Sequence, residues 1–151
     1  MNKALKSIKI ISVYVLSLLY IIVGVKHFIN PDFFIAIVPS YIKWKFEAVI
    51  ISGFFEIFLG ILLLFNKTRS MASWGIILLL IAVFPANIYL YASDTAREIL
   101  GVSKNQALIR VPFQFTLILI SYWHTKESHS RRLSIVCIVL FIFTLIYFLS
   151  I

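Results

Sequence analysis

The chain has 151 residues, of which 62% are hydrophobic and 13% are charged, and its mean hydropathy is +1.02. A soluble domain carries about 25% charged residues, so water cannot be the main solvent of this chain. The formal net charge is +8, and we attribute it to membrane topology and contact with anionic lipid, not to nucleic-acid binding. These values predict a polytopic membrane protein whose principal partner is the lipid bilayer.

Five apolar segments follow one another, at residues 7–29, 46–65, 70–92, 107–124 and 133–150. Each is close to the roughly 20 residues that a helix needs to cross a bilayer. None shows the alternation of an outer-membrane strand. We therefore predict an all-α, multi-pass membrane helical bundle, organised as a single domain over residues 1–151. The first segment is too long for a signal peptide and lacks a cleavage motif, so we expect it to be retained.

Lysine and arginine are distributed unevenly between the two sides of this bundle. With five spans, the side that holds the N-terminus carries eight bases and one acid, whereas the other side carries six bases and four acids. Short loops rich in Lys and Arg remain in the cytoplasm. The charge distribution therefore predicts a cytoplasmic N-terminus and a C-terminus outside.

The segment between the first two spans is predicted to lie at the outer interface. Pro31 ends the first helix, because the residue before a proline is biased away from helical conformation. The stretch from Pro31 to Pro39 is too short to span, and Tyr41 and Trp44 follow it. Aromatic residues of this kind gather at membrane interfaces. We expect a short interfacial segment at residues 31–45, folded over the helix ends.

Polar residues lie on particular faces of the predicted spans. In "SGFFEIFLG", the small residues Gly53 and Gly60 share a face with Glu56. Small residues allow close approach of helices in lipid, so this face should point inward. At about 1.5 Å per residue, Glu56 lies roughly 15 Å below the outer boundary.

"FPANIYLY" interrupts the third span with Pro85 and Asn87, and Tyr91 and Asp94 continue a polar stripe at helical spacing. The loop at residues 94–106 is the most hydrophilic stretch. The fourth span carries a second stripe, formed by Gln106, Arg110 and Gln114.

The polar residues of the four spans all fall in their outer halves. If these faces meet, they form a polar pocket that opens toward the outer leaflet, with Asn87 facing Glu56, Arg110 and Gln114. The ligand-binding candidates are therefore His27, Glu56, Asn87, Tyr91, Arg110 and Gln114.

Several of these polar residues, and Pro85, also have a structural interpretation. An ionisable residue in a span is expensive, so a functional role is the default hypothesis. Glu56 could instead be a protonated or Arg110-paired acid that fixes helix packing, and Arg110 could be an interfacial base that snorkels. Pro85 could be a simple kink that frees the Ile81 carbonyl, and His27 could be a satisfied interfacial histidine.

Several chemistries are excluded or disfavoured. His27 belongs to the outer side and His124 and His129 to the inner side, so they cannot hold one metal, and we expect no metal site. Cys137 is the single cysteine, which excludes an intrachain dithiol relay. No phosphate-binding loop or hydrolase serine motif is present. An accessory or binding subunit with no intrinsic cofactor is a better expectation than a stand-alone enzyme.

The stretches "GVKHFINPDFFIAIVP", "SGFFEIFLGILLL", "TRSMASWGIILLLIAVFPANIYL" and "IRVPFQFTLILISYW" resemble the DoxX-like family of small bacterial membrane proteins. The resemblance covers roughly residues 15–124 and implies a four-helix core in the bacterial cytoplasmic (inner) membrane. The last span would be an additional, lipid-facing fifth transmembrane helix. The recurrent positions of the family correspond to His27, Phe28, Pro31, Pro39, Gly53, Glu56, Gly60, Pro85, Asn87, Arg110, Pro112 and Gln114; we expect structural roles for Pro31, Pro39, Gly53, Gly60, Pro85 and Pro112.

The resemblance implies association with redox complexes, and three functions follow as hypotheses. The first is an accessory subunit that binds a quinone or similar amphiphile in the outer polar pocket, with Glu56 placed for proton exchange. The second is a non-enzymatic assembly factor, chaperone or lipid-binding protein, in which segments 31–45 and 94–106 dock another membrane protein. The third, a small transporter or proton-coupled channel, is disfavoured by the apolar inner half. A homo-oligomer is compatible with all three.

Overall fold

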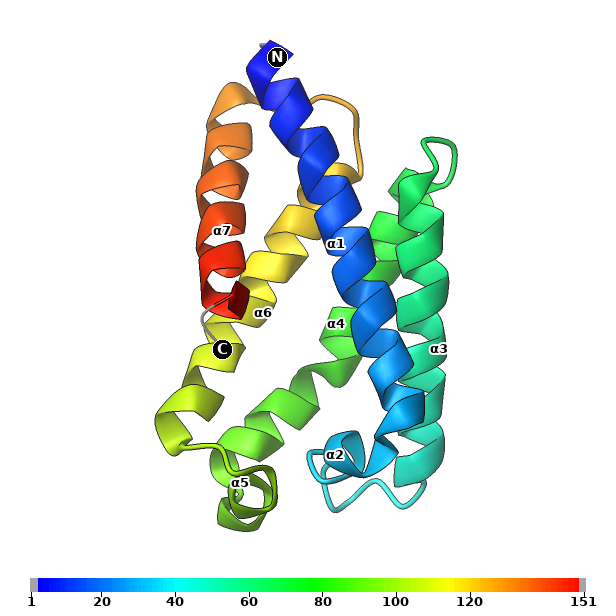
Figure 1. The fold of residues 1–151 in the computed structure, drawn as a ribbon, viewed down its shortest axis with the longest axis vertical. Helices are drawn as coiled ribbons and strands as arrows, with labels where there is room; N and C mark the ends of the chain where they lie inside the picture. The colour runs from blue at the N-terminus through cyan, green and yellow to red at the C-terminus, as the bar shows by residue number, and fades with distance from the viewer. Residues whose placement is uncertain (1–2, 150–151) are drawn as a thin grey trace.

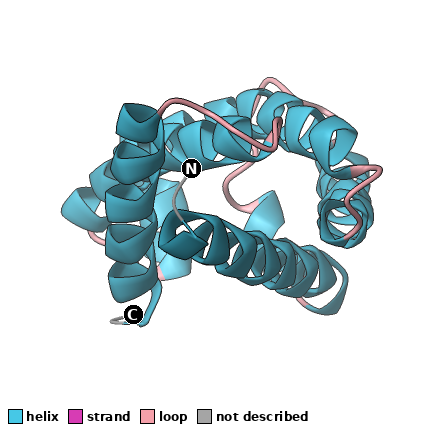
Figure 2. Ribbon diagram, turned by 90° about the horizontal axis from the view of Figure 1, so that it is seen from above, coloured by secondary structure: helices cyan, strands magenta, loops and turns pink. Residues whose placement is uncertain are grey.

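The computed structural model describes residues 3–149, and the helices in this range are connected by loops (Figures 1 and 2). The helices are α1 (Lys3–Ile29), α2 (Pro31–Ile35), α3 (Lys45–Leu64), α4 (Arg69–Ala92), α5 (Asp94–Leu100), α6 (Lys104–His124) and α7 (Arg131–Leu149). The all-helical prediction is confirmed for the described residues. A helix occupies each of the five predicted segments, although the expected end of the last one, residue 150, lies outside the described range.

Three of these helices, α1, α3 and α4, are long and apolar enough to cross a membrane. In lipid, backbone N–H and C=O groups must find partners within the chain, which favours continuous helices through these apolar segments. Helix α6 is long enough, with 21 residues, but it is less apolar than these three because it carries Lys104, Arg110 and two glutamines. The structure therefore supports a membrane protein with several apolar helices.

The long helices are arranged in packed pairs. Helices α1 and α3 lie side by side, α4 packs against both α3 and α6, and α7 packs against α6 and α1 (Figure 1). The short helices α2 and α5 lie at the end of the bundle opposite the N-terminus. The molecule thus has an end formed by the N-terminus and the α3–α4 and α6–α7 connections, and an end covered by α2 and α5.

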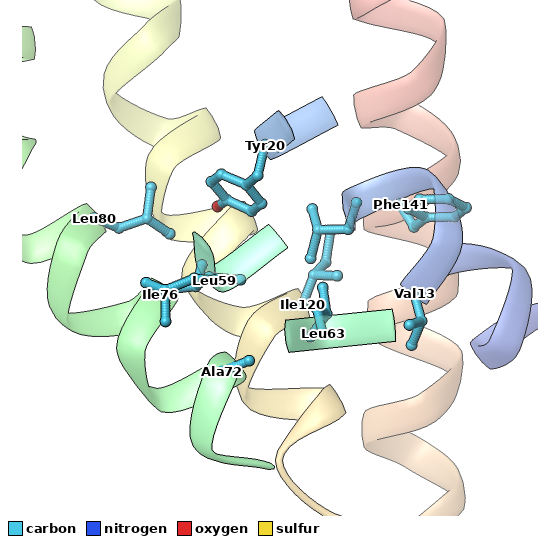
Figure 3. Packing of buried hydrophobic residues seen from close by; sticks show 10 residues of the cluster. Val13, Tyr20, Leu59, Leu63, Ala72, Ile76, Leu80, Ile120 and Phe141 are labelled. Carbon is cyan, nitrogen blue, oxygen red and sulfur yellow. The ribbon is translucent and has the colours of Figure 1, made fainter. Parts of the chain in front are cut away.

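The apolar core joins five helices (Figure 3). It contains Val13 and Tyr20 of α1, Leu59 and Leu63 of α3, Ile76 of α4, Ile120 of α6 and Phe141 of α7. On α7, Ser134, Cys137 and Phe141 are all buried and share one face at helical spacing. The expectation that this helix is only a lipid-facing addition is therefore wrong for one face, which packs into the common core.

A second apolar cluster closes the α2–α5 end. Leu90 and Ala96 form its buried part with Ala107, and Ile37 packs against it from the segment after α2. Helix α5 lies within the stretch that we predicted to be a loop. It starts because the Ser93 hydroxyl accepts a hydrogen bond from the Ala96 N–H, and it ends at Gly101, whose φ of 62° is left-handed.

The polar stripe predicted on the third span is shorter than expected. Helix α4 ends at Ala92, and Asp94 starts the separate helix α5. Asp94 is exposed and forms an ion pair with Arg97. It therefore does not continue the stripe of Asn87 and Tyr91. The predicted helix break at Pro31 is confirmed, because α1 ends at Ile29 and Pro31 takes the first position of α2.

Candidate functional site

Glycines hold α1 and α3 unusually close together. A Cβ atom on Gly53 would lie 2.5 Å from the His27 Cβ, and one on Gly24 would lie 2.7 Å from the Gly53 carbonyl oxygen. About two turns away on each helix, the Ser17 hydroxyl donates to the Gly60 carbonyl over 2.6 Å. The predicted inward face of Gly53, Glu56 and Gly60 therefore packs against α1. This close approach brings the side chains of His27 and Glu56 into contact.

His27 and Glu56 form a buried pair between the two helices. The His27 Nδ1 lies 3.2 Å from the Glu56 Oε2, and the two residues are 6% and 9% exposed. Nδ1 also lies 2.9 Å from the Val23 carbonyl oxygen. A carbonyl cannot donate, so Nδ1 must carry a proton that points to Val23. Glu56 Oε2 then receives electrostatic attraction but no hydrogen bond from the described residues.

Helix α2 supplies an aromatic wall for this pair. The Phe34 ring stacks on the His27 imidazole with centroids 3.6 Å apart and an interplanar angle of 20°. Phe33 packs edge-on against Phe34. Pro31 fixes the start of α2 directly after α1, which turns these rings back toward the bundle. Sequence reasoning did not single out Phe34, although its place three residues after Pro31 was a usable signal.

Asn87 and Gln114 form a second polar pair, between α4 and α6. The Asn87 Nδ2 donates to the Gln114 Oε1 over 2.7 Å, and the Gln114 Nε2 donates to the Leu80 carbonyl. Leu80 lies five residues before Pro85, where the proline ring disturbs the backbone hydrogen bonds of α4. The predicted contact between Asn87 and Gln114 is confirmed. The side-chain amide of Gln114 binds the Leu80 carbonyl, one residue before the Ile81 carbonyl that we expected to be free.

Two other candidates lie apart from both pairs. The Tyr91 ring faces the Lys104 ammonium, which lies 5.3 Å from the ring centroid. Arg110 is half-buried and forms no ion pair or hydrogen bond with the residues that the structure describes. The alternative in which Arg110 pairs with Glu56 is therefore wrong, because His27 takes that place. The six candidates form the pairs His27–Glu56 and Asn87–Gln114, with Tyr91 and Arg110 outside them.

Arg97 is a functional-looking residue that sequence reasoning missed. It is only 9% exposed, and its guanidinium donates to the Leu90 and Tyr91 carbonyls and to Asp94. The Leu90 and Tyr91 carbonyls belong to the last turn of α4, so Arg97 caps the C-terminus of that helix and fixes α5 against it. Its position three residues after Asp94 was the available signal. The contacts are all internal, which indicates a structural role.

The structural prolines take different positions. Pro39 is buried in the turn after α2, where its carbonyl accepts the Ile42 N–H over 3.0 Å. Pro85 and Pro112 lie inside α4 and α6, and both are exposed. The Thr116 hydroxyl donates to the Pro112 carbonyl. Each of Pro85 and Pro112 leaves the carbonyl four residues before it without its usual backbone donor, which is compatible with a bend of the helix at that point.

The family defined as a domain of unknown function (DUF8561) matches residues 16–125. The chain belongs to this family. No curated protein and no solved structure matches the chain. The matched region of the DUF8561 family contains both polar pairs and ends directly after α6, so α7 lies outside it. The resemblance to the DoxX-like family remains a prediction.

The two polar pairs of this DUF8561 protein differ in which of their polar atoms remain free to bind a ligand. Both polar atoms of the Gln114 amide are hydrogen-bonded, its Oε1 to the Asn87 Nδ2 and its Nε2 to the Leu80 carbonyl. The His27–Glu56 pair has one imidazole nitrogen, Nε2, for which the described residues provide no hydrogen bond. Besides the Nδ1 proton, one further proton on either His27 or Glu56 makes the pair neutral overall, which lowers the cost of its burial. The His27–Glu56 pair therefore retains a ring nitrogen and a carboxylate oxygen, Oε2, for a ligand.

Proposed function

We propose that this protein is a non-enzymatic accessory subunit of the cytoplasmic membrane that binds a quinone or a similar amphiphile beside His27 and Glu56. The observation that carries this proposal is the buried His27–Glu56 pair, with its aromatic neighbour Phe34. An ionisable pair inside a membrane span is expensive and marks a functional site by default.

The chemistry of the pair suits a carbonyl head group. With Nδ1 directed at Val23, the Nε2 of a protonated His27 is the nitrogen left to donate to a ligand. The Glu56 carboxylate would balance the charge of that imidazolium at 3.2 Å. Phe34 offers a flat surface to a ring, and the apolar helices around it suit an isoprenoid tail. This arrangement does not need three of the other ligand-binding candidates, Asn87, Gln114 and Arg110.

A binding titration tests the proposal. The purified protein in detergent, freed of endogenous quinone, should bind a short-chain ubiquinone analogue. Glu56→Gln should weaken this binding by about tenfold or more, because a hydrogen bond assisted by charge is worth about 1.5–3 kcal/mol. The matched control is Glu47→Gln, which removes the same charge from the exposed first turn of α3. The proposal fails if the native protein shows no saturable quinone binding.

A second function is favoured by the end of the bundle that α2 and α5 cover. Large apolar side chains are exposed there, on Tyr41, Trp44, Phe46 and Ile99. The segments that carry these side chains are held in fixed positions by the hydrogen bonds of Arg97 and by the second apolar cluster, which includes Ile37. An assembly factor would use such a surface to bind another membrane protein. Crosslinking from position 44 in native membranes tests this function, and the absence of a stoichiometric partner would contradict it.

The proposed topology includes five transmembrane helices, with α6 and α7 added to the three that are apolar enough by themselves. The N-terminal end, rich in lysine and arginine, would face the cytoplasm, and the α2–α5 end would face outward. In this orientation the His27–Glu56 pair would lie in the outer half of the membrane. Its location suits a ligand that is exchanged laterally with the bilayer.

A further inference from the structure

A pocket of about 570 Å³ lies at the end of the bundle opposite His27 and Glu56. It is formed by the first turns of α1, the start of α4 and the connection after α6, near the N-terminus in Figure 1. Its basic lining residues are Lys6, Lys9, Arg69 and Lys126, and its one acidic lining residue is Glu127. Four bases against one acid give the lining a formal charge of +3.

These bases are gathered without a matching counter-charge. Among the described residues, no ion pair involves any of the four. Lys9 is only 7% exposed, and its ammonium donates to the Lys126 carbonyl over 2.6 Å and to the Glu127 carbonyl over 3.3 Å. Arg69 donates to the Leu63 and Leu64 carbonyls, which end α3. Internal carbonyls therefore hold Lys9 and Arg69 in place but do not neutralise them.

His124 forms part of the pocket wall and is 2% exposed. The Ser12 hydroxyl donates to the Lys9 carbonyl, so the His124 Nε2, 3.2 Å away, must donate to Ser12. Nδ1 is then an acceptor, and no described residue donates to it. A buried acceptor without a donor is costly. A hydroxyl group on a bound molecule that reached Nδ1 would remove this cost.

The other part of the wall is apolar and faces the membrane. Ile10 and Tyr14 line the pocket from α1, and they are 42% and 56% exposed on a helix apolar enough to span. Because the basic part of the pocket continues onto an apolar surface that would face lipid, the pocket suits an amphiphile with an anionic head group. A free anion would use only the basic part.

We infer that this basic pocket binds the phosphate group of an anionic phospholipid. Lys6 and Lys126 are exposed at its rim and would contact the phosphate together with the fixed charges of Lys9 and Arg69. The acyl chains would lie along the Ile10–Tyr14 face of α1. The predicted orientation places the pocket in the cytoplasmic leaflet, whose surface is negatively charged. This site lies at the far end of the bundle from His27, so it does not depend on the proposed quinone site.

Native mass spectrometry of the detergent-solubilised protein tests the inference. Titration with phosphatidylglycerol should give one tightly retained lipid per chain, and phosphatidylcholine should not. The double variant Lys6→Gln/Lys126→Gln should bind phosphatidylglycerol at least about tenfold more weakly, because each base near an anionic surface contributes a factor of about five. Lys6→Arg/Lys126→Arg should restore binding, which would show that the loss does not come from misfolding.

The matched control is Lys3→Gln/Lys67→Gln, which removes two charges from the same end but outside the pocket. It should change binding less than about twofold, because neither base would contact the bound phosphate and salt screens exposed charges at a distance. Equal losses in the two double variants, or no loss in either, would overturn the inference. Inorganic phosphate distinguishes the source of the anion. Displacement of the lipid by millimolar phosphate supports recognition of the phosphate group, whereas binding of phosphate without any binding of phosphatidylglycerol would overturn a lipid site.

Discussion

His27 meets Glu56 because two glycines remove the space between the helices that carry them. Gly53 lies under the His27 Cβ, and Gly24 lies against the Gly53 carbonyl. The resulting separation of 3.2 Å between Nδ1 and Oε2 depends on that backbone approach. The small residues and the ionisable pair are therefore one structural unit, and disturbing the first should disturb the second.

Gly53→Ala should destabilise the protein by roughly 1–3 kcal/mol, because the new methyl group would push α1 away from α3. The change should also weaken quinone binding. The control is Gly75→Ala, where the nearest atom is the flexible end of the Leu59 side chain. Thermal unfolding of both variants in the same detergent measures the difference. Equal stabilities would contradict the close-packed interface.

Asn87→Ala should cost about 0.6–2 kcal/mol of stability, because it leaves the buried Gln114 Oε1 without its donor. A double-mutant cycle with Gln114→Ala should give a coupling energy of about 0.6 kcal/mol or more. Asn105→Ala is the matched control, since Asn105 is exposed on the first turn of α6. Additive effects of Asn87→Ala and Gln114→Ala would show that the two amides do not interact.

His129, in the connection between α6 and α7, should titrate below its usual range. Partial burial lowers the pKa of His129, and the nearby Lys9 and Lys126 lower it further. At pH 6.5 the ring should therefore be less than half protonated. NMR of the labelled histidines measures this midpoint. Lys126→Gln should raise the pKa of His129 because it removes one cation, and Lys67→Gln should leave this pKa unchanged. A midpoint above 6.5 in the native protein would contradict the proximity of His129 to Lys9 and Lys126.

Labelling of introduced cysteines tests the topology. In a Cys137→Ala background, Ser40→Cys should react with a membrane-impermeant maleimide from outside the cell. Ser128→Cys should react only after the membrane is opened. Both positions are exposed, so access depends on the side of the membrane alone. The reverse pattern would contradict a cytoplasmic N-terminus, and labelling of both sites from outside would contradict a span formed by α6.

The sequence predicted the features that depend on one helix at a time. Apolar length placed the five long helices, because about 20 apolar residues are needed in each span. Pro31 placed the break after α1, and the spacing of Gly53, Glu56 and Gly60 placed an inward face. The contact between Asn87 and Gln114 is an exception that joins two helices, and it was predicted because the polar residues of both spans fall in their outer halves.

Features that depend on two helices together were harder to predict. Glu56 pairs with His27 and not with Arg110, because the offset of α1 against α3 decides the partner. Periodicity within one helix does not determine that offset. Helix α5 was missed because seven residues are too few for a helical pattern, although Ser93 and Gly101 marked its ends. The sequence indicated only topology and general contact with anionic lipid for the basic residues of the pocket, since these residues come from three separate parts of the chain.

Photoaffinity labelling with an azido-quinone tests the central claim most directly. Peptide mapping of the labelled protein should place the modification on α2 or on the facing parts of α1 and α3, close to Phe34 and Glu56. An excess of unmodified quinone should prevent the labelling, and Glu56→Gln should reduce it about tenfold, because it removes the charge that supports the protonated His27 as a donor to the quinone. Labelling confined to α7 or to the basic pocket, or labelling that unmodified quinone does not reduce, would contradict the proposed site.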